Sequence, residues 1–200
     1  MAPSVALTSK DNERMIMAGT YTPATLPFTV SGEKADLLTL LADQRELFKV
    51  TLRGITEAQA RQRTTVSTLT LGGLVKHLAT GEQGTLEELV ERDDTAEFDM
   101  AKAAHAYELT DDETFAGWVE EYDRASAALD AHVAGVDSLD ELIPQMTAPW
   151  QPEREWWTIR KMMLHKLRET AHHAGHADII REALDGQSTM AALYDGPEIS

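Results

Sequence analysis

Apolar residues recur every three or four positions along four long stretches of the chain, a spacing that predicts amphipathic helices. The stretches cover about residues 31–54, 69–90, 110–135 and 158–184. No segment alternates apolar and polar residues for long enough to indicate a sheet, and no internal repeat is visible. Four helices of this length bury their apolar faces best against one another, so the predicted fold class is an all-α four-helix bundle.

Capping residues predict where these helices begin and end. Ser31 is the expected N-cap of the first helix, and Thr110, with Glu113 three residues later, forms an expected capping box for the third. Thr158 is the expected cap of the fourth helix, which should stop before Gly186. Two further signals are the stop at Gly54 and a capping box for a short turn at Thr56 and Gln59.

The helices divide the chain into three parts. Residues 1–30 are proline-containing and aperiodic and are expected to form an N-terminal arm, residues 31–186 the bundle, and residues 187–200 a C-terminal tail. The linkers 92–109 and 136–157 are longer than helix packing requires. Long loops in a compact bundle are commonly functional or mobile.

The composition narrows the classes of partner. With 18 basic and 34 acidic residues the net charge is −16, so most of the surface repels nucleic acid and anionic membranes. The absence of cysteine excludes disulfides, thiolate metal ligands and a cysteine nucleophile, and thiol chemistry would need a thiol on a small molecule. Residues 1–30 lack the continuous apolar run of a secretion signal, and a cytoplasmic protein is therefore expected.

Histidines gather on the predicted fourth helix. At about 100° per residue, four of them lie within about 60° of Glu169, so that five potential metal ligands share one helix face. The apolar residues of this helix direct at least part of that face inward, although a solvated polar face is the alternative. The four histidines are His165, His172, His173 and His176.

Three pairs on this face have the i, i+4 spacing at which neighbouring side chains meet and could chelate one ion. A metal site in a bundle core also needs a ligand from a facing helix. The second helix offers His77, for which a hydrogen-bonded core position is the alternative. The three pairs are His165 with Glu169, Glu169 with His173, and His172 with His176.

Three glycines share the helix face of His77. Gly73, Gly81 and Gly84 stand at positions −4, +4 and +7 from it. Each interior glycine costs about 0.8 to 1 kcal/mol of helix stability relative to alanine, so another interaction must offset the cost. We expect them to leave an open volume around a metal ion, the alternative being close helix packing.

Other chemistry-bearing residues surround the fourth helix. The linker before it, APWQPEREWWT, is rich in tryptophan, and Trp150 and Trp157 are expected to contact a cofactor or substrate at the mouth of the cavity, as is Trp156. Packing in the core is the alternative for all of them. Asp178 and Arg181 are three residues apart and are interpreted as a mutual pair, a tie to a neighbouring element or a solvated pair.

Two motifs resemble the DinB-like superfamily of metal-binding four-helix bundles, in particular its actinobacterial branch related to mycothiol-dependent transferases and maleylpyruvate isomerases. They are GLVKHLATGE at residues 73–82 and LHKLRETAHHAGHADIIREALDG at residues 164–186. Together with the helix order, the resemblance covers about residues 33–186. It implies a DinB-like four-helix bundle with long inter-helix loops and an N-terminal arm.

The resemblance also implies a set of metal ligands. The ion would be held by the histidine of the second helix and by two residues four apart on the last helix, which here are His77, Glu169 and His173. Maleylpyruvate isomerases are similar to this chain in using glutamate at the middle position. The chain departs from the branch at His172, where arginine is usual, and this leaves His172 with His176 as a rival chelating pair.

Two imidazoles and a carboxylate suit zinc, nickel, iron or manganese, with zinc the first expectation, and three protein ligands leave a position open for water or substrate. His176 and His165 are the candidate catalytic residues, because each could orient a ligand or move a proton. Partly exposed histidines without a chemical role are the alternative for both.

The resemblance therefore implies a metal-dependent thiol S-transferase, in which mycothiol or a similar small thiol binds the ion as thiolate and attacks an electrophile. The alternatives are a metal-dependent hydrolase and a non-catalytic, metal-stabilised binding protein. The expected partners are the thiol and an electrophilic small molecule, and the resemblance also implies a homodimer.

Overall fold

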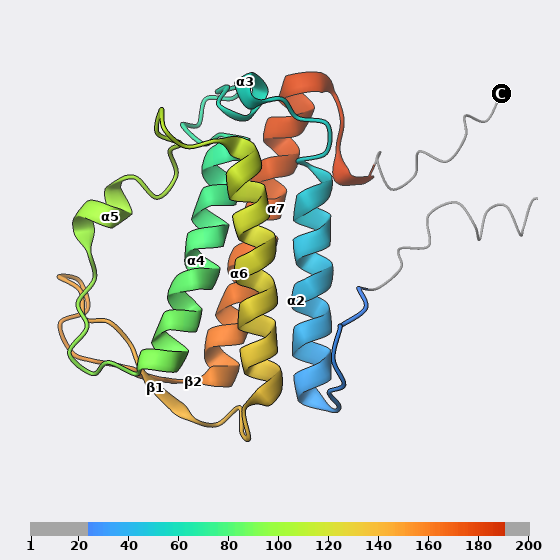
Figure 1. Ribbon diagram of the computed structural model, residues 1–200. Coiled ribbons are helices and arrows are strands. Elements are labelled where there is room, and N and C mark those ends of the chain that lie inside the picture. Colours follow the sequence, from blue (N-terminus) through green and yellow to red (C-terminus); the bar gives the residue numbers. More distant parts are fainter. Residues whose placement is uncertain (1–23, 191–200) are drawn as a thin grey trace, which may run out of the picture.

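Four long helices lie side by side and form the body of the molecule (Figure 1). In the computed structural model, which describes residues 24–190, they are α2 (Glu33–Val50), α4 (Leu71–Glu91), α6 (Phe115–Gly135) and α7 (Ile159–Asp185). The predicted four-helix bundle is confirmed. Most of the predicted arm, up to residue 23, and the last ten residues of the predicted tail lie outside the described residues.

Short elements lie in the connections. They are the helices α3 (Glu57–Ala60) and α5 (Met100–Ala104) and the strands β1 (Leu142–Pro144) and β2 (Trp156–Thr158). The two strands pair antiparallel, with Ile143 opposite Trp157, at the end of the bundle where α7 begins (Figure 1). Strands of three residues are too short to produce a visible alternating pattern, which is why the sequence did not predict this sheet.

Two predicted helix starts were wrong. The N-cap of α2 is Gly32 rather than Ser31, because Gly32 adopts a φ of 62°, which interrupts the helix before Glu33. α6 starts after Thr114, whose Oγ1 accepts from the Gly117 amide at 3.1 Å, and not at Thr110.

Half of the predicted capping box at Thr110 does form. The Thr110 amide donates to Glu113 Oε2 at 2.8 Å, but the Thr110 hydroxyl donates to Asp112 at 2.6 Å and is not a helix cap. The same Glu113 oxygen accepts from Lys76 Nζ at 2.8 Å. The motif therefore closes a turn and fastens it to α4 instead of starting α6.

The predicted stop at Gly54 was also wrong, because α2 ends at Val50 and a turn follows up to Gly54. Three other boundaries follow the sequence signals. Thr56 and Gln59 form the capping box of α3. Thr158 caps α7 by accepting from the Lys161 amide at 3.1 Å, and α7 ends before Gly186, which has a φ of 81°. Glycine takes this left-handed conformation without the steric cost of a Cβ atom.

The core consists of two apolar clusters with a buried ionic layer between them. One cluster contains Phe48, Leu74 and Tyr122, and the other contains Leu41, Leu129 and Met163. Between them Arg45 of α2 reaches carboxylates on two other helices. None of the helices in residues 24–190 is long and apolar enough to cross a membrane.

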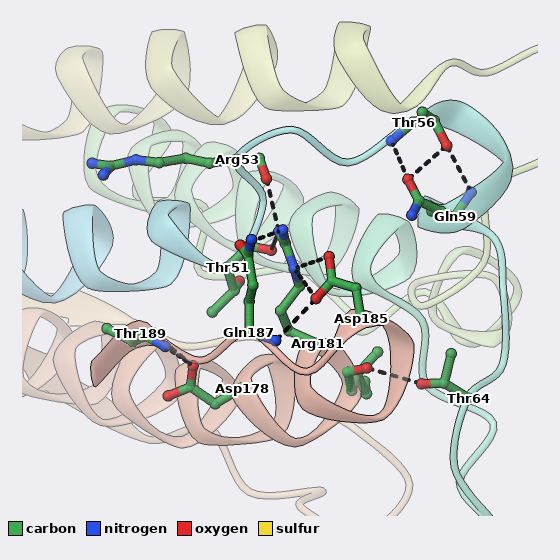
Figure 2. Close-up of polar contacts among 11 residues, drawn as sticks. Thr51, Arg53, Thr56, Gln59, Thr64, Asp178, Arg181, Asp185, Gln187 and Thr189 are labelled. Atoms are coloured by element: carbon green, nitrogen blue, oxygen red, sulfur yellow. Dashed lines mark hydrogen bonds and ion pairs between the residues drawn. The ribbon is translucent and has the colours of Figure 1, made fainter. Parts of the chain in front are cut away.

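Arg181 of α7 joins this helix to the end of α2 (Figure 2). Its guanidinium donates to the carbonyls of Thr51 and Arg53 at 2.7 and 2.8 Å and pairs with Asp185 at 2.9 Å. Asp178 instead accepts from the amide of Thr189 at 2.8 Å (Figure 2). Asp178 and Arg181 therefore do not pair with each other. Each binds a neighbouring segment of the chain, which was one of the three interpretations of this pair.

Candidate metal centre

Three side chains from two adjacent helices converge at one place. His77 lies on α4, two turns after its N-cap Thr70, and Glu169 and His173 lie one turn apart on α7. Each offers one ligand atom, and these atoms all lie within 4.8 Å of one another. The His77 and His173 rings are 4.8 Å apart, and His173 Nε2 lies 3.7 Å from Glu169 Oε2. Donors bound to one ion lie about 3 to 4 Å apart, so binding would draw this group together.

The rival pair, His172 and His176, has no third potential ligand at metal-binding spacing in the described residues. His172 is exposed, and its ring packs edge-on against that of His176 at 4.4 Å. Within residues 24–190, only His77, Glu169 and His173 form a group of three potential ligands at metal-binding spacing. His176 instead contacts the back of His173, with 3.3 Å between their Nδ1 atoms. The geometry therefore favours the set implied by the sequence resemblance over the pair His172 and His176.

The protonation states suit a cation. Burial, together with His173 and Lys166, lowers the pKa of His77 to about 4. Burial also lowers the pKa of His173. For Glu169, burial acts to raise the pKa, but the Arg168 hydrogen bond and His165 outweigh it and hold the pKa below its usual value. At neutral pH the site thus offers unprotonated ring nitrogens and an ionised carboxylate, the forms that bind metal ions.

Tyr107, which the sequence analysis did not identify, reaches the same place from the linker between α4 and α6. Its ring stacks on His77 with centroids 4.0 Å apart and planes 17° apart. Its hydroxyl lies 3.0 Å from His77 Nε2 and 3.4 Å from His173 Nε2. The length of linker 92–109 was the one sequence signal for a functional residue there, but an aperiodic segment does not indicate which residue faces the site.

The glycines of α4 do not surround an open volume as we expected. A Cβ atom on Gly73 would lie 2.0 Å from the Tyr107 carbonyl oxygen, so this position is closely packed. At Gly81 a Cβ atom would lie 3.2 Å from Lys166 Nζ, whereas at Gly84 it would meet nothing within 4 Å. The open-volume interpretation is wrong at Gly73, because the linker backbone occupies that space.

The remaining predicted site residues lie at different places. His165 contacts the other oxygen of Glu169, with 3.8 Å between its Nδ1 and Oε1, and its ring meets Trp157 edge-on at 5.5 Å. Trp157 therefore lies next to the candidate metal ligands through His165. Trp150 is 65% exposed and packs on Phe98 at 5.1 Å.

A cleft of about 250 Å³ has Tyr107 in its wall, but His77, Glu169 and His173 do not line it. Arg63, Thr68 and Thr70 line it as well. Arg63 is exposed, and in the described part of the chain its guanidinium has no hydrogen-bond or ion-pair partner. In a chain with a net charge of −16, this cleft offers a cation that is unpaired among the described residues. A groove of about 340 Å³ between α4 and α6 contains none of the histidines.

Solved structures support the same fold. A conserved protein from Enterococcus faecalis is 15% identical, with a TM-score of 0.59, and the match covers 79% of this chain and all of that one. YfiT from Bacillus subtilis, described as a probable metal-dependent hydrolase with an unusual four-helix bundle topology, is 12% identical with a TM-score of 0.56. That match covers 82% of this chain and 95% of YfiT. The sequence has no significant match among curated proteins.

A family model covers most of the bundle. The model that describes mycothiol-S-transferases matches residues 36–186, from the first turn of α2 to the glycine that follows α7. This range contains both motifs on which the DinB-like resemblance rests, and His77, Glu169 and His173 with them. The resemblance is thereby confirmed, and the chain belongs to the mycothiol-S-transferase family.

Proposed function

We propose that this protein is a divalent-metal-dependent S-transferase that joins a small thiol, mycothiol or one like it, to an electrophilic small molecule. One observation carries the proposal: two neutral imidazoles and an ionised carboxylate converge from α4 and α7. Membership of the mycothiol-S-transferase family supports the choice of thiol. The chain has no cysteine, so the nucleophilic sulfur belongs to the cosubstrate.

His77, Glu169 and His173 are the proposed metal ligands, and zinc is the ion that we expect first. A divalent cation held there would lower the pKa of a thiol bound in its open position and so supply a nucleophile near neutral pH. The donor set fits such an ion, because both imidazoles keep their lone pairs at neutral pH and the carboxylate keeps its charge.

In this proposal, His176 and His165 assist the metal site from positions next to the ligands His173 and Glu169. A metal-bound histidine usually has a partner at its second ring nitrogen, which fixes the ring orientation. His176 takes this role in the proposal, and the 3.3 Å distance between its Nδ1 and His173 Nδ1 supports it. His165 lies beside Glu169 and Trp157 and is the group proposed to exchange protons with the thiol.

The cleft is the proposed place for the rest of the substrates. Arg63 would pair with an anionic group, and the hydroxyls of Thr68 and Thr70 would accept and donate hydrogen bonds there. Trp157 and, at the far side of its linker, Trp150 are the proposed aromatic contacts. A cytoplasmic homodimer completes the proposal, and sedimentation of the purified protein tests the dimer.

The alternatives are a hydrolase, in which water rather than a thiol is the nucleophile, and a binding protein with a purely structural ion. Titration of the cobalt-substituted full chain with a small thiol separates them. Coordination of the thiol should produce a thiolate-to-cobalt charge-transfer band, and His77→Ala should abolish it together with the bound cobalt. An unchanged cobalt spectrum at saturating thiol would contradict the transferase.

A further inference from the structure

The segment that carries Tyr107 is fastened to the bundle by several independent contacts. Lys76 Nζ donates to the carbonyl of Glu108 at 2.9 Å, and Arg61 donates to the carbonyl of Leu109 at 3.0 Å. Leu109 is buried and packs so close to Gly72 that a Cβ atom there would lie 2.5 Å from its Cδ1. The backbone around Tyr107 is therefore held in place from α3 and α4, although it belongs to an aperiodic linker.

Gly73 fixes Tyr107 itself. The Tyr107 carbonyl oxygen occupies the space of a Cβ atom, 2.0 Å from its ideal position, so only glycine allows this approach. A glycine in a helix interior costs about 0.8 to 1 kcal/mol relative to alanine. At position 73, the close approach of the Tyr107 backbone explains why glycine is present despite this cost.

The Tyr107 hydroxyl has the spacing of a metal ligand. Imidazole nitrogens bind ions such as zinc at about 2.0 to 2.1 Å, so two donors on one ion are about 3.3 to 3.4 Å apart at a tetrahedral angle and about 2.8 to 3.0 Å apart at a right angle. The hydroxyl oxygen lies 3.0 Å from His77 Nε2 and 3.4 Å from His173 Nε2. It is therefore already at ligand spacing from both proposed nitrogen donors.

Without an ion, hydrogen bonds can account for both contacts: the hydroxyl donates its proton to one ring nitrogen, and its oxygen accepts from the N–H of the other ring. The stacked ring of His77 restricts the phenol to this position, at 4.0 Å between centroids. One cation bound between the three atoms would interact with all their lone pairs at once.

We propose that the Tyr107 oxygen is a fourth protein ligand of the metal held by His77, Glu169 and His173. This inference rests on the metal site of the proposed function and extends it. The donor set then consists of two nitrogens and two oxygens, from α4, α7 and the linker between α4 and α6. A thiol must approach on the side that Tyr107 leaves free, and metal binding fastens the wall of the substrate cleft.

Ferric iron is the probe, because a phenolate bound to iron(III) gives a visible charge-transfer band, and resonance Raman excitation of that band reports tyrosine ring modes. The full-length wild type loaded with iron(III) should show both. Tyr107→Phe should show neither, and its cobalt(II) affinity should fall by about 10- to 100-fold, since even indirect ligand contacts carry losses of that size. His105→Ala is the matched control, because His105 is an exposed residue of the same segment, and it should retain the band.

Gly73→Ala provides a second test that leaves the tyrosine in place. Its new methyl group should displace the Tyr107 carbonyl and weaken or remove the band, while circular dichroism retains the helical signal. Wild-type protein that binds iron(III) and cobalt(II) stoichiometrically without a tyrosinate band would overturn this inference and leave the three-ligand site intact. Full metal binding by His77→Ala would instead overturn the proposed site, and this inference with it.

Discussion

The bundle contains two polar clusters that differ in how their charges are balanced. In the ionic layer, Arg45 Nη2 lies 2.8 Å from Glu82 and Nη1 lies 2.8 Å from Asp130, and all three side chains are buried. In the metal-ligand cluster, His77 and Glu169 are partly exposed and only His173 is buried. The ionic layer is thus buried around one cation, although Asp130 Oδ1 has no hydrogen-bond partner in the described residues, whereas the metal-ligand cluster is partly exposed and carries unprotonated nitrogens.

The difference separates a structural role from a chemical one. The Arg45 guanidinium donates to two carboxylates on two helices. The metal-ligand cluster combines the lone pairs of two imidazoles with one negative charge. Buried charges that pair with each other hold helices together. A group of unprotonated nitrogens and an ionised carboxylate without a cation of its own is suited to bind a metal ion.

The largest expected effect comes from breaking the ionic layer. Arg45→Met leaves Glu82 and Asp130 buried without their cation, and the free energy of unfolding should fall by about 3 to 5 kcal/mol. Chemical denaturation followed by circular dichroism measures it. Adding Glu82→Gln and Asp130→Asn should recover part of the loss. A loss below about 1 kcal/mol would show that the layer is not a stabilising pair network.

The metal-ligand cluster should make stability depend on pH. His77 has a pKa of about 4 in the folded chain, against 6.5 as its ordinary value, so the unfolded chain binds more protons between these values. Stability of the metal-free protein should therefore fall as the pH drops from 6.5 to 4, with about 3 kcal/mol due to His77. Urea unfolding across this range, compared with His77→Gln, isolates the contribution. Parallel curves for the two proteins would contradict it.

Two substitutions on α7 test the membership of the metal-ligand cluster. Glu169→Gln removes the only charged donor and should weaken divalent-metal binding by more than about 100-fold, because an amide oxygen is a poorer ligand than a carboxylate. His172→Ala, at an exposed position, should cost less than about tenfold. Calorimetric titrations at one pH compare them, since ligand protonation shifts apparent affinity. An equal or larger loss for His172→Ala would favour the rival pair.

The smallest effect concerns α4, which contributes residues to both clusters. A Cβ atom on Gly84 would meet nothing within 4 Å, so Gly84→Ala should stabilise the protein by about 0.8 to 1 kcal/mol and leave both clusters unchanged. Thermal unfolding and a cobalt(II) titration are the measurements. A weakened cobalt affinity in Gly84→Ala would show that flexibility of α4 contributes to the site.

Much of the fold was predictable because its signals are local. Helical periodicity predicted the four helices, and Thr158 and Gly186 predicted the ends of α7. The start of α6 was predicted four residues early, because Thr110 and Glu113 have the spacing of a capping box but close a turn that Lys76 holds. The sequence alone does not show which of two competing threonines a helix will use.

The candidate ligands were predictable for a similar reason, and their surroundings were not. Spacing on one helix face placed Glu169 and His173 together, and the family motifs implied His77 as their partner. Tyr107 is 30 residues from His77 along the chain and was not predicted, and the glycine at position 73 was interpreted as open space. Both depend on how a linker folds back over α4.

The sequence by itself determined the elements whose cause lies within a few residues: four amphipathic helices, the caps of α3 and α7, and one helix face rich in histidine. Tertiary structure decided which donors meet across helices, that Arg45 pairs with Glu82 and Asp130, and that Tyr107 lies against His77. The physical reason is the range of the interactions. Periodicity and capping act over one or two turns, whereas burial and ion pairing act between residues that only the folded chain brings together.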